Sequence, residues 1–189
     1  MDLEKRYQEK FGYCDTFKSL GWNSKQSQQI RFFILIGMTG IEFDDTFLDV
    51  GCGYGDFSNM VENYFGIDVR LSAIEKAIEK YGNKFKNCTI DDISQNYDWV
   101  VASGVFSLKE ENWLEKTTHT INKMFSLCSK GIALNFLSEL SDSPRLHSDI
   151  LHVKIEDVIP IITRMSNSFV IRHDYLFNDF TIYIYKIRL

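Results

Sequence analysis

The strongest constraint in the sequence is a short apolar run that ends in closely spaced glycines, TFLDVGCGYGDF. Gly51, Gly53 and Gly55 follow the apolar run directly. Glycine adopts backbone conformations, and permits close approaches, that a Cβ atom would forbid. The pattern therefore predicts a strand followed by a tight turn, at which a ligand can come close to the backbone.

After this turn, apolar runs typical of strands alternate with segments of helical periodicity. The expected strands are 46–50, 64–69, 84–90, 98–103 and 130–136, and the expected helices are 55–64, 72–82, 109–126 and 154–166. Within the second helix, Ser72 and Glu75 are spaced as a capping box, and Gly82 is a stop signal. Such alternation predicts a parallel sheet with helices on both faces, which binds ligands at the carboxyl ends of its strands.

The last two apolar runs, 168–177 and 179–187, leave no room for a helix between them. Consecutive strands joined this closely must pair antiparallel. The sequence therefore predicts an α/β fold with a doubly wound, Rossmann-like sheet of seven strands. The sheet is expected to be mostly parallel, with an antiparallel C-terminal hairpin strand.

Residues 1–44, ahead of the glycine turn, have the pattern of helices. Ser24 is placed to cap a helix that carries Ile30, Phe33 and Ile34. We interpret this segment as an N-terminal helical lid and residues 45–189 as the ligand-binding core of a single-domain protein.

Composition excludes several classes of function. The formal net charge is −5 and the basic residues are scattered, which disfavours a nucleic-acid partner. No apolar run approaches the roughly 20 residues of a membrane span, and the N-terminus has no visible export signal. The four cysteines are widely spaced, which predicts reduced thiols in the cytoplasm rather than a zinc site; no metal is expected.

Three ligands compete for the glycine turn. A phosphate loop requires Lys followed by Ser or Thr, and neither follows Gly55. The dinucleotide fingerprint requires glycine at position 56, where Asp56 would repel a pyrophosphate. S-adenosylmethionine carries a sulfonium, an ammonium and a ribose diol, so Asp49 and Asp68 become favourable to binding.

From residue 46 to 189 the chain resembles the class I S-adenosylmethionine-dependent methyltransferases, most specifically in LDVGCGYG, with support from GIDV. The resemblance implies that Asp68 binds the ribose, that Asp92 binds the adenine amino group, with its neighbour Asp91 as the alternative, and that the turn after the fourth strand lines the methionine part. Either acid could instead cap a turn. The expected cofactor-binding residues of the core are Asp49, Gly51, Cys52, Gly53, Gly55, Asp68, Val69, Asp91, Asp92, Ile93, Ser103 and Gly104.

Outside these motifs, Arg31 is a candidate partner for the ligand's carboxylate, because a guanidinium binds a carboxylate in a bidentate pair. In the final hairpin, His173 is a candidate general base, with Tyr175 beside it. Each could equally be a structural residue. The expected substrate-binding residues are Trp22, Phe106, Asn135 and Asn178, of which the aromatic ones could instead belong to the core.

The resulting hypothesis is an enzyme that moves the methyl group of S-adenosylmethionine to a nucleophilic atom, oxygen or nitrogen, of a small molecule. The alternatives are a non-catalytic S-adenosylmethionine-binding protein or partner subunit, and a protein methyltransferase. Base-amino methylation of DNA is disfavoured, because SGVF stands where that group of methyltransferases has a Pro-Pro motif. Cytosine C5 methylation is disfavoured because no cysteine follows a proline.

Overall fold

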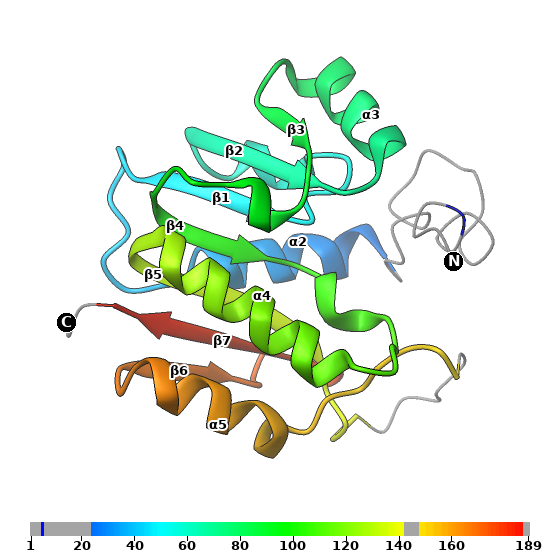
Figure 1. Ribbon diagram of the computed structural model, residues 1–189, viewed down its shortest axis with the longest axis vertical. Coiled ribbons are helices and arrows are strands. Elements are labelled where there is room, and N and C mark those ends of the chain that lie inside the picture. Colours follow the sequence, from blue (N-terminus) through cyan, green and yellow to red (C-terminus); the bar gives the residue numbers. More distant parts are fainter. Residues whose placement is uncertain (1–4, 6–23, 142–147, 187–189) are drawn as a thin grey trace.

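The computed structural model describes residue 5 and residues 24–141 and 148–186. Its centre is a sheet of seven strands (Figure 1). The strands are β1 Thr46–Val50, β2 Asn63–Asp68, β3 Phe85–Asn87, β4 Tyr97–Ala102, β5 Cys128–Leu137, β6 Phe169–Arg172 and β7 Asp179–Tyr185. Their spatial order is β3-β2-β1-β4-β5-β7-β6.

Strands β1 to β5 run parallel, whereas β7 is antiparallel to both of its neighbours, β5 and β6. The few residues between β6 and β7 cannot hold the helix that a parallel crossover requires. The predicted seven-stranded, mostly parallel sheet with an antiparallel hairpin strand is confirmed.

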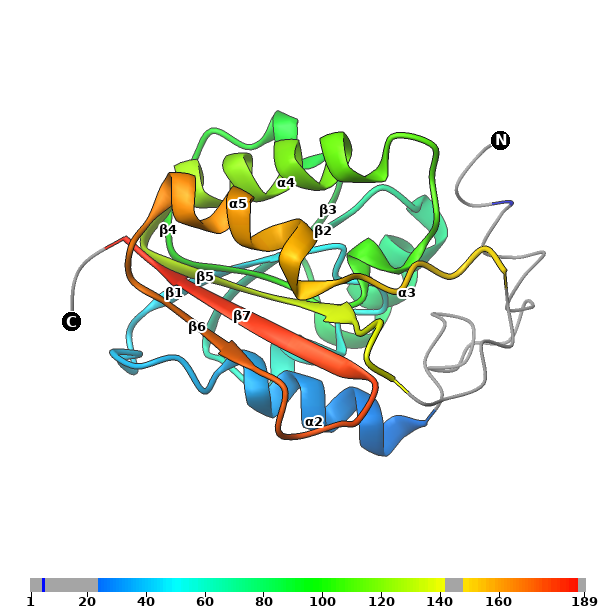
Figure 2. The same cartoon turned by 90° about the horizontal axis from the view of Figure 1, so that it is seen from below.

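Helices cover both faces of the sheet, as a doubly wound fold requires (Figure 2). The helices are α2 Lys25–Leu35, α3 Leu71–Tyr81, α4 Trp113–Leu127 and α5 Ile155–Met165. One buried cluster joins α2 and α3 to the sheet, for example Leu35 and Ala77 to Trp99. The cluster on the other face joins α4 and α5 to the sheet, for example Ile121 and Val158.

The helix ends test three local predictions. The Ser24 side chain accepts a hydrogen bond from the Ser27 N–H at 3.0 Å, which confirms the predicted cap of α2. The capping box at Ser72 is wrong, because α3 already begins at Leu71 and Arg70 occupies the cap position without a side-chain bond. Gly82 does end α3, with φ of +84°.

Several segments are shorter than predicted. One is β6, Phe169–Arg172, which the sequence predicts over 168–177, and two others lie near the glycine turn. The helix expected over 55–64 is a single 3-10 turn, η2 Asp56–Asn59, because β2 begins at Asn63. The third strand ends at Asn87 and is followed by another 3-10 turn, η3 Ile90–Asp92. Both connections are therefore tight, which keeps their side chains close to the carboxyl edge of the sheet.

The described part of the predicted lid, from residue 24 on, includes α2, which packs against the sheet through Phe32 and Leu35. Residues 1–4 and 6–23 lie outside the described residues, so the lid and the domain boundary at residue 44 stay predictions. Within 24–141 and 148–186, none of the helices combines the length and apolar character needed to cross a membrane.

We predict that Gly131→Ala in β5 destabilises the fold by about 1–3 kcal/mol through overpacking. A Cβ atom at this position would lie 2.7 Å from the Ile184 carbonyl oxygen and 2.8 Å from the Trp99 ring. Urea unfolding followed by circular dichroism measures the change, with Glu75→Ala on the exposed face of α3 as the control. Equal stability of the two variants would contradict this packing.

Candidate functional site

The glycine turn joins the end of β1 to η2 in a conformation that suits only glycine. Gly51, Gly53 and Gly55 have φ angles of +72°, +56° and +76°. The N–H groups of Gly51 and Cys52 both donate to the Ile67 carbonyl, at 2.8 and 2.9 Å. The turn is therefore fixed to the end of β2, at the carboxyl edge of the sheet.

Two of these glycines are also required by packing inside the protein. A Cβ atom on Gly51 would lie 2.5 Å from a methyl carbon of Val105, and one on Gly55 would lie 2.4 Å from the Phe85 ring. Their presence is thus explained without any ligand. The case for a ligand at this turn has to come from the acidic side chains around it.

Asp68 ends β2 directly beside the turn and is 6% exposed. Its Oδ2 accepts a hydrogen bond from the Gly53 N–H and its Oδ1 one from the Arg70 N–H, both at 2.9 Å. The Arg70 side chain lies 3.4 Å from Oδ1. A carboxylate has about four lone-pair positions, so Asp68 keeps acceptor capacity in a fixed orientation.

Asp49, on β1, is buried next to the turn. It accepts a hydrogen bond from the Tyr64 hydroxyl at 2.8 Å. Burial, with a further contribution from the Asp68 charge, raises the pKa of Asp49 to about 7, although the Tyr64 hydrogen bond opposes the shift. Burial and these two carboxylates also raise the pKa of the Cys52 thiol, so it is not a reactive thiolate.

The turn after β4 is braced from β5. Gly104, with φ of +76°, donates its N–H to the Asn135 side-chain oxygen at 2.9 Å. The Asn135 amide donates in turn to the Ser103 hydroxyl at 3.1 Å. Asn135, predicted as a substrate residue, is therefore occupied in holding this turn. Phe106 is also in the core, stacked on Phe136 with 5.0 Å between ring centroids.

The two acids after β3 both have partners. Asp92 accepts from the backbone N–H and the hydroxyl of Thr89, at 2.9 and 2.7 Å, which is the capping alternative considered for it. These hydrogen bonds lower the pKa of Asp92. Asp91 is exposed and lies 2.9 Å from the His119 ring nitrogen on α4. Of the hydrophobic cofactor candidates, Ile93 is buried and Val69 is exposed.

Arg31, on α2, forms a buried ion pair with Asp179 at the start of β7. Burial raises the pKa of Asp179, and the guanidinium charge opposes this shift. The predicted partner of a ligand carboxylate is thus bound to a carboxylate of the protein. Sequence reasoning missed Asp179, because the two residues are 148 positions apart and no local pattern connects them.

A second polar cluster, also missed from the sequence, surrounds Asp56 in η2. Lys80 and the Tyr81 hydroxyl, both from α3, donate to its carboxylate at 2.7 and 2.8 Å. The Gln28 amide on α2 lies 3.5 Å away. Asp56 thus connects the glycine turn to both helices on this face of the sheet.

The hairpin residues lie at the carboxyl edge of β5. The His173 ring nitrogen Nε2 is 2.7 Å from the Ser138 hydroxyl, and the ring stacks on Phe180.

The Tyr175 hydroxyl is 2.7 Å from the Thr181 hydroxyl, and burial raises the pKa of Tyr175. The Asn178 carbonyl accepts a hydrogen bond from the Ser138 N–H. Ser138 was missed from the sequence, and the predicted Trp22 lies outside the described residues.

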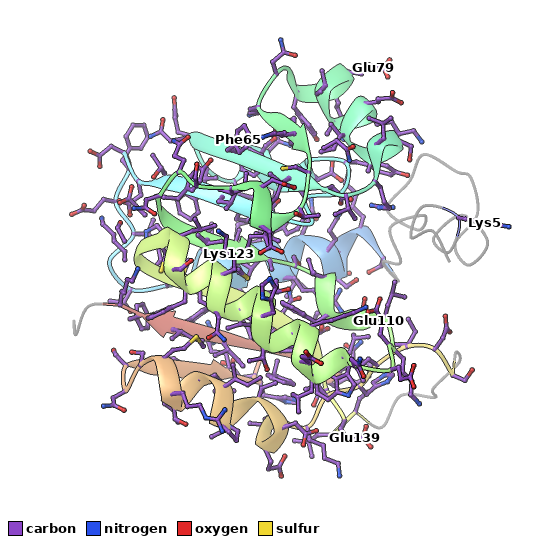
Figure 3. The ribbon with its side chains drawn as sticks, in the orientation of Figure 1. Lys5, Phe65, Glu79, Glu110, Lys123 and Glu139 are labelled. Atoms are coloured by element: carbon purple, nitrogen blue, oxygen red, sulfur yellow. The ribbon has the colours of Figure 1, made fainter. Side chains whose placement is uncertain are left out.

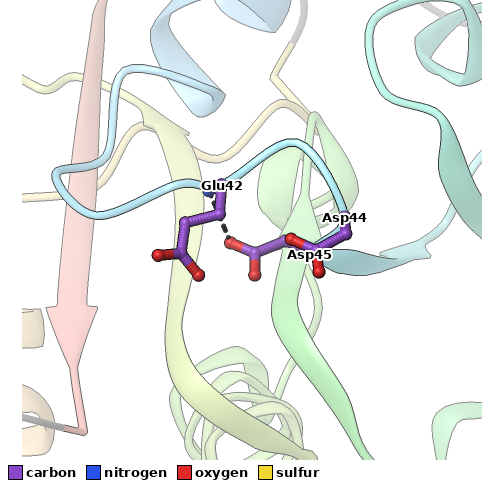
Figure 4. Close-up of side chains that lie close together, drawn as sticks. All are labelled: Glu42, Asp44 and Asp45. Carbon is purple, nitrogen blue, oxygen red and sulfur yellow. Dashed lines mark hydrogen bonds between the residues drawn. The ribbon is translucent and has the colours of Figure 1, made fainter.

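A cluster of three acids, Glu42, Asp44 and Asp45, lies in the loop before β1 (Figure 4). Because β1 begins after this loop and ends at the glycine turn, the cluster lies at the opposite end of the strand. The Lys130 ammonium is 2.7 Å from Glu42 and 2.6 Å from Asp45. Asp45 also accepts a hydrogen bond from the Trp99 indole. These contacts give the cluster a structural explanation.

We expect Asn135→Leu to loosen the turn after β4, because the partly buried Gly104 N–H would lose its acceptor. Leaving a buried donor unpaired costs about 1–3 kcal/mol. Amide hydrogen exchange at Gly104 should quicken, together with a lower stability to urea. Ser103→Ala removes only the second bond and is the control; the same exchange rate in both variants would contradict the bracing role.

Arg31→Met should destabilise the protein by about 3–5 kcal/mol, because it leaves the Asp179 carboxylate buried without its guanidinium. The pKa of Asp179 would then lie further above its unfolded value, so the loss is expected to grow as pH rises from 5 to 8. Urea unfolding at both pH values measures this. Arg164→Met, at an exposed arginine of α5, is the control. A loss of stability that is the same at both pH values would contradict the proposed role of the Arg31–Asp179 ion pair.

No model of a protein family matches the sequence, and no curated protein does. Solved structures are similar. The N-methyltransferase NodS from Bradyrhizobium japonicum WM9, in complex with S-adenosyl-L-homocysteine, has a TM-score of 0.67 at 15% identity, covering 96% of this chain and 97% of that chain. Magnesium protoporphyrin IX methyltransferase from Synechocystis PCC 6803, with bound SAH, has a TM-score of 0.64 at 15% identity, covering 97% and 93%.

A third similar structure is a methyltransferase from Thermotoga maritima described as a possible histamine N-methyltransferase. It has a TM-score of 0.62 at 10% identity and covers 86% of this chain and 96% of that chain. Identities this low establish the likeness of the fold alone. The chain has the Rossmann-like fold of the class I S-adenosylmethionine-dependent methyltransferases.

Proposed function

We propose that the chain binds S-adenosylmethionine and transfers its methyl group to an oxygen or nitrogen atom of a small-molecule acceptor. The observation that carries the proposal is the carboxylate of Asp68. It is held by the Gly53 and Arg70 N–H groups, next to the turn that positive φ angles create. The fold shared with structures that contain S-adenosylhomocysteine supports the same cofactor.

The residues around the turn suit this ligand chemically. The remaining lone pairs of Asp68 can accept hydrogen bonds from a ribose diol. Asp49 is a buried carboxylate without a cationic partner among the described residues, and a cationic ligand would stabilise its charge. A pyrophosphate would instead meet the carboxylates of Asp49, Asp56 and Asp68, which disfavours a dinucleotide.

We propose further cofactor contacts around this centre. Val69 is exposed directly after Asp68, where an adenine ring could pack on it. Asp91 and Asp92 both lie in η3 and are exposed. Asp92 is held within its own turn by two hydrogen bonds from Thr89, whereas Asp91 contacts the exposed His119 ring, so we favour Asp91 for the adenine amino group. This reverses the preference drawn from the resemblance.

S-adenosylmethionine supplies, when bound, a methyl group already activated on a sulfonium. The chain's task is then mainly to align the acceptor, and alignment alone can remove much of the barrier. Asn135 serves this by fixing the turn at Ser103 and Gly104. We propose His173, fixed by Ser138, as the base that accepts the acceptor's proton, and Tyr175 and Asn178 as its neighbours on the acceptor side.

We also propose that residues 1–44 include a lid over the site, which α2 anchors on the sheet, and that the protein works in the cytoplasm. The polar contacts of α2 support the first point, because Gln28 and Arg31 connect this helix to η2 and to β7 beside the site. The widely spaced cysteines support the second.

A calorimetric titration with S-adenosylhomocysteine tests the cofactor. We expect binding with a dissociation constant of about 1–50 μM, with a free energy of about −6 to −8 kcal/mol. Asp68→Ala should weaken it at least about tenfold, since a buried hydrogen-bonding partner is lost. Glu79→Gln, on the outer side of α3, is the control (Figure 3).

NAD is titrated in parallel as the competing ligand. Binding of NAD in place of S-adenosylhomocysteine would overturn the proposal. If S-adenosylhomocysteine binds, incubation with labelled S-adenosylmethionine and a panel of acceptors separates an enzyme from a protein that only binds the cofactor. Label recovered in protein, rather than in small molecules, would favour a protein methyltransferase.

A further inference from the structure

Asp49 is a buried carboxylate whose charge is not balanced by a cation in the part of the chain that the structure describes. It is 4% exposed, and the Tyr64 hydroxyl is the one hydrogen-bond partner of its carboxylate among the described residues. Its neighbours in register are Gly66 on β2 and Val101 on β4, and neither carries a charge. The group therefore lies in a place where ionisation is costly unless a cation arrives.

The surroundings make this place more negative. Asp68 lies on the neighbouring strand β2 and acts on Asp49 by charge repulsion, and both carboxylates help to raise the pKa of the Cys52 thiol. Among the described residues, Arg70 is the one cationic side chain in contact with either carboxylate, and it contacts Asp68. Within 24–141 and 148–186, the titratable groups that act on Asp49 are thus Tyr64, Cys52 and Asp68, and none of them supplies a positive charge.

We propose that Asp49 makes the protein distinguish S-adenosylmethionine from S-adenosylhomocysteine by the positive charge of the sulfonium, in a way that depends on pH. This rests on the proposed function. The two ligands share the adenosine, ammonium and carboxylate groups and differ in one methyl group and one positive charge. An unbalanced buried carboxylate beside the turn attracts the charged ligand and gains nothing from the neutral sulfur of the other.

The direction of the pH dependence follows from the ordinary linkage of binding and protonation. A sulfonium nearby favours the ionised carboxylate, so binding of S-adenosylmethionine lowers the pKa of Asp49 from its value of about 7. Below pH 7 the group is protonated and the binding energy is partly spent on releasing that proton. Above pH 7 the carboxylate is already charged and the preference for S-adenosylmethionine is complete.

The test is calorimetric titration of the full chain with each ligand separately, between pH 6 and pH 8.5. We expect the preference for S-adenosylmethionine over S-adenosylhomocysteine to rise about fivefold to tenfold over this range, since each pKa unit is worth a factor of ten. In Asp49→Asn, which keeps an acceptor for Tyr64, this rise should disappear. Any pH dependence of binding that remains in Asp49→Asn is caused by the titration of the ligands themselves.

Two further variants separate the outcomes. Tyr64→Phe removes the hydrogen bond that lowers the pKa of Asp49, so the rise should move to higher pH. Glu79→Gln changes the net charge equally at an exposed position and should leave the profile as in the wild type. A preference that is flat with pH in the wild type, or unchanged in Asp49→Asn, would overturn the inference while the proposed function stands. Failure of both ligands to bind at every pH would overturn both.

Discussion

The site depends on one bifurcated interaction, in which the Ile67 carbonyl accepts hydrogen bonds from Gly51 and Cys52. This contact bends the chain over the end of β2 immediately after it leaves β1. It brings the Gly53 N–H to the carboxylate of Asp68, the next residue after the accepting carbonyl. The turn and its acid are thus positioned by the sheet itself, and a change in the pairing of β1 with β2 would move both together.

The sequence predicted the elements whose signals are local. Apolar runs, glycine spacing and the short link between the last two strands led to the doubly wound sheet and its antiparallel strand. Asp68 was placed beside the turn by the same logic, because adjacent parallel strands end at one edge. Local signals also misled, since the helical spacing of Phe57 and Met60 gave only one 3-10 turn before β2.

What the sequence could not predict is how distant polar residues combine. Arg31 and Asp179, or Ser138 and His173, meet only after the whole sheet has formed. Asn135 contacts the turn after β4 because β5 lies beside β4 in the sheet. No spacing in the sequence predicts that contact. Candidate residues chosen by type were therefore often near the site, but their partners altered what each of them can do.

The position of β7 has a consequence for how the protein forms during synthesis. It is the last of the seven strands along the described chain, yet it lies between β5 and β6. On the ribosome β6 emerges before the strand that attaches it to the rest of the sheet, so it has no partner until β7 follows. Asp179, which begins β7, is also synthesised late. The buried ion pair of Arg31 on α2 with Asp179 therefore cannot form until almost the entire core has been synthesised.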